Sequence, residues 1–190
     1  AFSVEPDTGP VGTKVTVKGT GFPLGEVAIW YDALEVATTI ADDRGNFDVT
    51  LEVPPSTAGQ HQITIKPALV TKVFAVIPKI SLSPSQGIGP STVVGSGFPA
   101  CSKVTIATGA TVLPSVPADA VTDSDGSFTA IITIPATASG NYVVTAQSGE
   151  SNASNIFTVK TPRAYGCALA MVVAVAIGAT IIAVLIAVLR

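Results

Sequence analysis

Residues 5–23 read EPDTGPVGTKVTVKGTGFP, and a shorter form of the pattern, SPSQGIGPSTVVGSGFP, recurs at residues 83–99. In the first stretch Val15 and Val17 alternate with polar residues, as expected of a β-strand with one buried and one solvated face. The glycines and prolines around them are typical of tight turns. The stretch predicts a short antiparallel strand between turns, and its recurrence predicts two copies of one β-domain.

A second block repeats too: DDRGNFDVTLEVPPSTAG at residues 42–59 matches DSDGSFTAIITIPATASG at residues 123–140. The first block recurs after 76 residues and the second after 81, so the second copy has five extra residues in the stretch TGATVLPSVPADA. Phe47 and Phe128, each two residues after the turn glycine, are predicted to lie in the two cores. Short alternating runs spaced 8–12 residues apart are typical of a β-sandwich. In the first copy the runs lie near residues 2–5, 14–18, 26–31, 34–40, 47–53, 61–66 and 72–77.

These motifs resemble the IPT/TIG group of immunoglobulin-like domains. The matching residues in the first copy are Pro6, Gly9, Gly12, Val15, Val17, Gly19, Gly21, Phe22 and Pro23. In the second copy they are Pro84, Gly87, Val93, Gly95, Gly97, Phe98 and Pro99, with a spacing two residues shorter. The resemblance implies an immunoglobulin-like fold for both copies and brings no common catalytic residues. Such domains act as spacers, adhesion modules and surface-display repeats.

The predicted fold class is therefore all-β, with two tandem immunoglobulin-like sandwiches at residues 1–78 and 79–160. A juxtamembrane linker at 161–167 and one C-terminal transmembrane α-helix at 168–189 follow. The connection VIPKIS leaves little room for a flexible linker, which predicts a semi-rigid junction between the two sandwiches. Ala1 is not Met, which predicts a mature chain after removal of a signal peptide, with a fragment of a longer protein as the alternative.

The predicted helix runs from Ala168 to Leu189 without a charged residue. At 1.5 Å per residue it spans roughly 33 Å, enough to cross a bilayer core. With the signal peptide removed, the sandwiches lie on the extracellular or periplasmic side. Small residues recur at every fourth position, a spacing that lets membrane helices pack closely. The two predicted packing stripes are Ala170, Ala174 and Gly178, and Ala179, Ala183 and Ala187. The abundance of Ala in membrane helices is the alternative explanation.

The acidic loop at Asp123 and Asp125 has two interpretations. Spaced Asp residues before Gly126 resemble the start of a calcium loop, but no Glu follows at the distance that an EF-hand needs. The equivalent loop of the first copy, Asp42 to Gly45, lacks the alternate Asp spacing. Asp and Gly between β-like runs are typical of a hairpin turn, in which Gly takes positive φ. The turn is the favoured interpretation, and calcium at Asp123 and Asp125 is the alternative.

Other candidate residues are few, and they favour a protein that is not an enzyme and carries no cofactor. His61, the single histidine, is predicted to be exposed on a strand. Trp30 is predicted to point away from the core and to be a contact residue, unless Leu34 or a domain edge covers it. Asn152 lies in a short glycosylation sequon. Two cysteines, Cys101 and Cys167, are too few for a disulfide framework.

Composition and charge limit the partners. Charged residues make up 12% of the chain, against about 25% in average domains. Net charge is −3 without a basic patch, which excludes the usual nucleic-acid binder. The predicted partners are membrane lipid and other membrane-protein subunits that contact the helix. Two functions remain open: an accessory subunit of a membrane assembly whose outer arm contacts proteins, or an adhesin that binds carbohydrate or another cell. A surface-sorting tail is the weakest alternative, because no LPxTG motif precedes the apolar segment.

Overall fold

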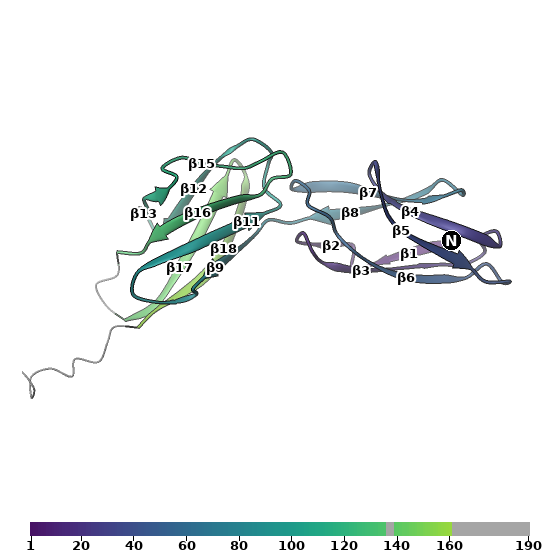
Figure 1. Cartoon of the computed structure of the whole chain (residues 1–190), viewed down its shortest axis with the longest axis horizontal. Coiled ribbons are helices and arrows are strands. Elements are labelled where there is room, and N and C mark those ends of the chain that lie inside the picture. The colour runs from purple at the N-terminus through teal and green to yellow at the C-terminus, as the bar shows by residue number, and fades with distance from the viewer. Residues whose placement is uncertain (136–138, 161–190) are drawn as a thin grey trace, which may run out of the picture. The chain divides into compact units, whose positions relative to one another are not determined.

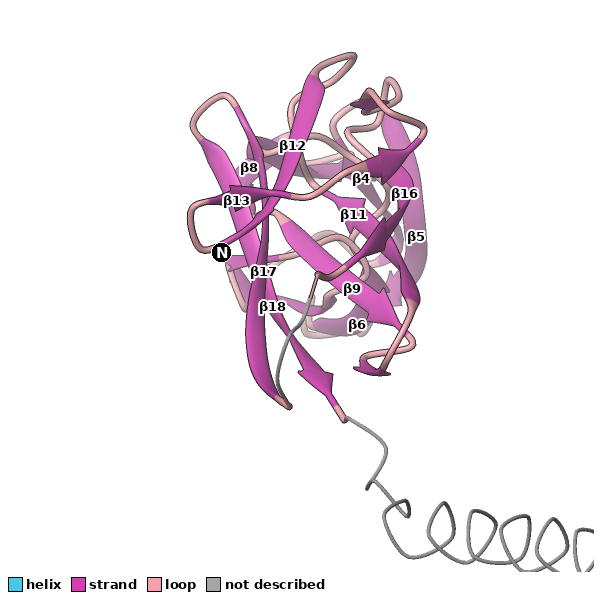
Figure 2. Cartoon of the chain, turned by 90° about the vertical axis from the view of Figure 1, so that its left-hand side faces the viewer, coloured by secondary structure: helices cyan, strands magenta, loops and turns pink. Residues whose placement is uncertain are grey.

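The structure is a computed structural model that describes residues 1–135 and 139–160. The described residues form strands β1 to β18 joined by turns, without a helix (Figure 2). Strands β1 to β8 pair only with one another, and strands β9 to β18 do the same (Figure 1). The two sequence repeats therefore each build their own pair of sheets, and the all-β immunoglobulin-like prediction is confirmed for this part of the chain.

The first repeat is a sandwich of two sheets with the strand orders β1-β3-β6 and β2-β8-β7-β4-β5. Its strands are β1 (Phe2–Glu5), β2 (Thr8–Gly9), β3 (Lys14–Gly19), β4 (Gly25–Tyr31), β5 (Leu34–Ala41), β6 (Phe47–Glu52), β7 (Gly59–Lys66) and β8 (Val70–Val76). The chain crosses between the sheets after β1, β2, β3, β5 and β6, and the course from β3 onward is the Greek-key course of immunoglobulin-like sandwiches. The seven strands predicted from the alternating runs are all present.

The core of the first repeat lies between these sheets and contains the predicted apolar faces. Val15 and Val17 of β3 and Ile63 and Ile65 of β7 are fully buried. Phe47 is also buried, as predicted, at the start of β6. Alternate residues of β3, β4 and β7 therefore point inward, because successive side chains of a strand point to opposite faces of its sheet.

The second repeat has the same plan, with the strand orders β14-β16-β11-β9 and β10-β18-β17-β12-β13, and β15 also paired with β12. Its strands are β9 (Lys79–Ser83), β10 (Gln86–Gly87), β11 (Pro90–Ser96), β12 (Lys103–Thr108), β13 (Thr111–Val112), β14 (Ser115–Val116), β15 (Ala120–Val121), β16 (Phe128–Thr133), β17 (Gly140–Ser148) and β18 (Ser151–Val159). Val93, Phe98 and Val144 are completely buried in its core, and Phe128 is 5% exposed.

The five extra residues of the second repeat change the course of one edge. In the first repeat β5 forms one continuous edge strand beside β4. In the second repeat the equivalent segment divides into three short strands: β13 and β15 pair with β12, and β14 pairs with β16 of the other sheet. The insertion therefore adds a fourth strand to the sheet that contains β9, β11 and β16.

The predicted membrane helix lies outside the described residues. Residues 1–135 and 139–160 contain no helix long and apolar enough to cross a membrane. The helix-packing stripes and Cys167 fall in the same undescribed stretch and stay predictions.

Candidate functional site

In each repeat the Gly-Phe-Pro motif contacts the acidic loop and the phenylalanine that follows it; we call these the two signature motifs. The amide of Phe22 donates a hydrogen bond to the carbonyl of Gly45 (3.0 Å), and the amide of Phe98 donates to that of Gly126 (3.0 Å). Phe22 packs edge-on against Phe47 with ring centroids 5.0 Å apart, and Phe98 against Phe128 at 5.4 Å. The repeated glycines and phenylalanines therefore form one structural contact in each sandwich.

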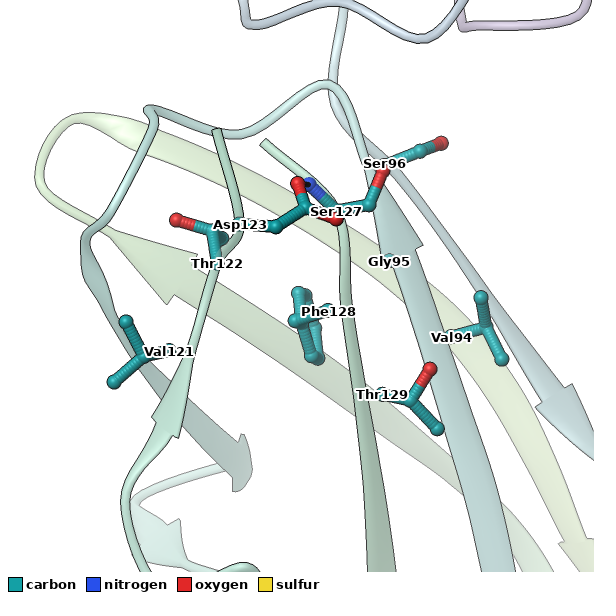
Figure 3. Close-up of a pocket in the computed structure, with 9 residues that line it drawn as sticks. All are labelled: Val94, Gly95, Ser96, Val121, Thr122, Asp123, Ser127, Phe128 and Thr129. Atoms are coloured by element: carbon teal, nitrogen blue, oxygen red, sulfur yellow. Dashed lines mark hydrogen bonds between the residues drawn. The ribbon is translucent and has the colours of Figure 1, made fainter. Parts of the chain in front are cut away.

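In each acidic loop the side chain of the first aspartate stabilises a turn by accepting hydrogen bonds from backbone amides. Asp123 Oδ1 accepts hydrogen bonds from the backbone amides of Asp125 (2.9 Å) and Ser127 (2.8 Å), as Figure 3 shows for Ser127. Asp42 Oδ1 does the same with Arg44 and Asn46, and the amide of Asn46 is the main cause that lowers the pKa of Asp42. The turn glycines Gly45 and Gly126 have φ of +74° and +73°, as predicted.

The loops are not hairpin turns, however. The loop of the first repeat joins β5 to β6, which belong to different sheets, and the loop of the second repeat joins β15 to β16 in the same way. The prediction of a turn is confirmed and that of a hairpin is wrong, because the chain crosses the sandwich at this point. No group of three or more acidic, His or Cys side chains suited to a metal ion lies within the described residues. Calcium at Asp123 and Asp125 stays an untested alternative.

His61 is not an exposed strand residue. Its side chain is only 12% exposed and stacks on Tyr31 with ring centroids 5.1 Å apart. Nδ1 lies 2.7 Å from Asp32 Oδ2, and Nε2 lies 2.9 Å from the carbonyl of Thr57. Both ring nitrogens face acceptors of the protein itself, so neither is left to act as a catalytic base.

The contacts of His61 are structural. His61 lies near the start of β7, and its Nε2 contacts the carbonyl of Thr57, four residues upstream. In immunoglobulin domains a tyrosine at the equivalent corner bonds back to the upstream backbone in this way. Tyr142 holds the position in the second repeat, 81 residues on. Beside His61, burial raises the pKa of Tyr31 to about 12, and the Tyr31 hydroxyl lies 3.0 Å from Ser56 Oγ.

Trp30 lies on the outward side of β4, opposite Thr64 of β7, as its alternation with Ile29 predicts. Its ring is covered on one face by Lys66, whose Nζ lies 3.4 Å from the ring centroid. Lys66, which makes this cation–π contact, is a residue outside the predicted alternatives. Asn152, the candidate glycosylation residue, is exposed, and Cys101 is exposed too.

The same shallow hollow occurs in both repeats. In the first it has a volume of about 430 Å³ and is lined by Lys18, Gly19, Thr20, Asp42, Asn46, Phe47 and Asp48. In the second it has a volume of about 410 Å³ and is lined by Val94, Gly95, Ser96, Val121, Thr122, Asp123, Ser127, Phe128 and Thr129 (Figure 3). Lys18 and Asp48 form an ion pair of 3.0 Å at the first hollow, whereas uncharged Val94 and Thr129 hold these positions at the second.

This difference extends over the outward face of a whole sheet. On β1, β3 and β6 of the first repeat, five outward positions carry charge: Glu5, Lys14, Lys18, Asp48 and Glu52. The strand registers place Ser83, Pro90, Val94, Thr129 and Thr133 at the equivalent positions of the second repeat. All five charges are therefore replaced by uncharged side chains, and Lys79 lies beyond them at one corner.

We call this surface the uncharged patch. It consists of Ser81, Ser83, Pro90, Thr92, Val94, Val116, Thr129, Ile131 and Thr133 on strands β9, β11, β14 and β16. Val94 and Ile131 are each 45% exposed, and Val116 is 69% exposed. Val116 belongs to β14, the strand that the insertion adds beside Ile131. The charges lost from this sheet and the extra strand therefore lie on the same face.

No protein-family model matches the chain, and no curated protein matches it. Among solved structures the chain is similar to invasin, a bacterial integrin-binding protein, at 18% identity and a TM-score of 0.34 over 85% of this chain and 39% of that one. It is similar to the D0-D1 domain of intimin at 14% identity and a TM-score of 0.32, over 85% of this chain and 98% of that one. The BSP domain of a biofilm-associated protein is similar at 17% identity and a TM-score of 0.30, over 85% and 29%. This chain spans about two-fifths of the length of the invasin structure, and all three identities are low. The function proposed for this chain therefore rests on its own residues.

Proposed function

We propose that the chain is a non-catalytic, single-pass membrane protein of the cell surface whose immunoglobulin-like repeats make protein contacts. Its working surface is the uncharged patch of the second repeat. Residues 168–189 anchor the chain, and the two repeats form the arm of an accessory subunit outside the membrane. The patch is the observation that carries this proposal.

The composition of the patch supports a contact role. Charged residues are depleted from the cores of protein interfaces. Solvated sheet faces ordinarily carry charge, as the equivalent face of the first repeat does with Lys18 and Asp48. Both repeats share one fold, so the fold itself does not require an uncharged face. A contact that removes water from this face supplies a physical reason for the difference.

The side chains that could act as catalytic acids or bases support a protein without catalytic activity. His61 has both ring nitrogens engaged, and Asp42 and Asp123 use a carboxylate oxygen to hold turns. Carbohydrate binding by stacking is less well supported, because Lys66 occupies one face of Trp30. Protein contact through the patch is therefore the preferred function.

The double substitution Val94→Lys with Thr129→Asp is expected to release the chain from its complex. It gives the second repeat the ion pair that the first repeat already has between Lys18 and Asp48. The fold tolerates this pair, so unfolding free energy should change by no more than about 0.5 kcal/mol. The measurement is native gel migration after mild-detergent extraction of the full chain from its own membranes. The native chain should migrate in a complex, and the variant as a single chain.

The control is the reverse exchange, Lys18→Val with Asp48→Thr, which removes the ion pair from the first repeat. This variant should migrate with the native complex, because the uncharged patch is unchanged. Release of both variants, or of neither, would contradict a contact role for the patch.

A further inference from the structure

We infer that the uncharged patch binds the uncharged patch of a second copy of this chain. The inference rests on the proposed membrane anchoring and adds the identity of the partner. It places two second repeats face to face, related by a two-fold axis, with each patch contacting its own counterpart.

Charge is the first argument for a second copy. In a two-fold contact the same surface meets itself, so a like charge near the axis would face its own copy. The patch places Thr92, Val94 and Ile131 at its centre, and Lys79 lies at a corner. A self-contact would therefore bury β-branched and hydroxyl side chains without burying an unpaired charge.

Size is the second argument. Three strands spaced about 4.8 Å apart, each contributing about five residues, and the two-residue strand β14 make a patch of roughly 300 Å². A stable complex between two freely diffusing proteins usually buries about 800 Å² on each partner. The patch is too small to hold such a partner by itself, but it suits a contact that a second attachment supports.

The chain beyond the last strand supplies that attachment. Strand β18 ends at Val159, and the apolar segment begins at Ala168. The eight residues between them span at most about 30 Å, so each second repeat stays close to its own anchor. Two anchors side by side would hold two patches at an effective concentration in the millimolar range. The small-residue spacing of Ala170, Ala174 and Gly178 permits such close packing of two helices.

The test is cross-linking of the full chain, purified and reconstituted at low density in lipid vesicles. Cys101 and Cys167 are replaced by Ser, and Ile131→Cys puts one thiol at the centre of the patch. The matched control is Thr50→Cys, because Thr50 holds the equivalent place on β6 of the first repeat. A short bis-maleimide should give roughly tenfold more cross-linked dimer with Ile131→Cys than with Thr50→Cys.

Adding Val94→Lys and Thr129→Asp to the Ile131→Cys chain should reduce the dimer to the control level. Flotation of the vesicles reports anchoring separately. A chain that floats but gives no more dimer at Ile131 than at Thr50 overturns the inference and leaves the anchoring in place. A chain that does not float overturns the anchoring, and the inference with it. Equal dimer with and without the Lys-Asp pair also overturns the inference.

Discussion

Gly45→Ala is expected to destabilise the first repeat by about 3–5 kcal/mol. Gly45 has φ of +74°, where an L-residue with a side chain is strained by about 1–2 kcal/mol. A Cβ at this position would also overlap the backbone carbonyl oxygen and amide of Phe22. The backbone cannot move away without breaking the hydrogen bond between Phe22 and Gly45.

Gly12→Ala is the matched control. Gly12 has a similar φ of +81°, but a Cβ there would meet nothing within 4 Å. Its cost should be about 1–2 kcal/mol, the strain alone. Denaturant unfolding of both variants can be followed by the fluorescence of Trp30, the single tryptophan, which reports the first repeat. Equal losses at the two positions would show that the contact between the two signature motifs adds no stability.

His61→Ala is expected to cost about 2–3 kcal/mol in the same experiment. The substitution removes the stack on Tyr31 and the contacts of the ring nitrogens with the Asp32 carboxylate and the Thr57 carbonyl. His61→Tyr should lose less, because the second repeat carries Tyr142 at this corner position. A loss below about 0.5 kcal/mol for His61→Ala would mean that these contacts are not structural. His61 would then have to be reconsidered as a functional residue.

The strands and cores could be predicted from the sequence because local alternation determines which face of a strand is buried. Alternation predicts that Val15 and Val17 are buried, and the position two residues after the turn glycine predicts the same for Phe47; all three are buried. The short strands β2 and β10 could not be predicted, since two residues have no measurable period. They are recognised only by their parallel pairing with β8 and β18.

Contacts between distant residues explain the wrong predictions. The environment of His61 depends on Asp32, 29 residues upstream, and on the turn that holds it. The loop from β5 to β6 crosses between sheets because the two strands pair in different sheets. Asp and Gly serve equally well in a hairpin turn and in such a crossing, so the sequence of the loop does not distinguish them.

The uncharged patch was missed for a different reason. A search for reactive residues passes over Thr92, Val94 and Ile131, which are ordinary strand residues. The patch can be found by comparing the two repeats position by position. That comparison shows that charged residues such as Lys18 and Asp48 are replaced by uncharged ones in the second copy. That comparison needs the strand register to show that the replaced residues share one face.

The most direct test of the account is carbene footprinting of the full chain in its native membrane. Val116 and Ile131 lie in the uncharged patch and are 69% and 45% exposed in the isolated chain, whereas Leu24 and Ile40 of the first repeat are 73% and 74% exposed. The account predicts weak labelling of Val116 and Ile131 in the native chain and strong labelling in the variant with Val94→Lys and Thr129→Asp. Leu24 and Ile40 should be labelled strongly in both. Strong labelling of Val116 and Ile131 in the native chain would contradict the claim that the patch is a contact surface.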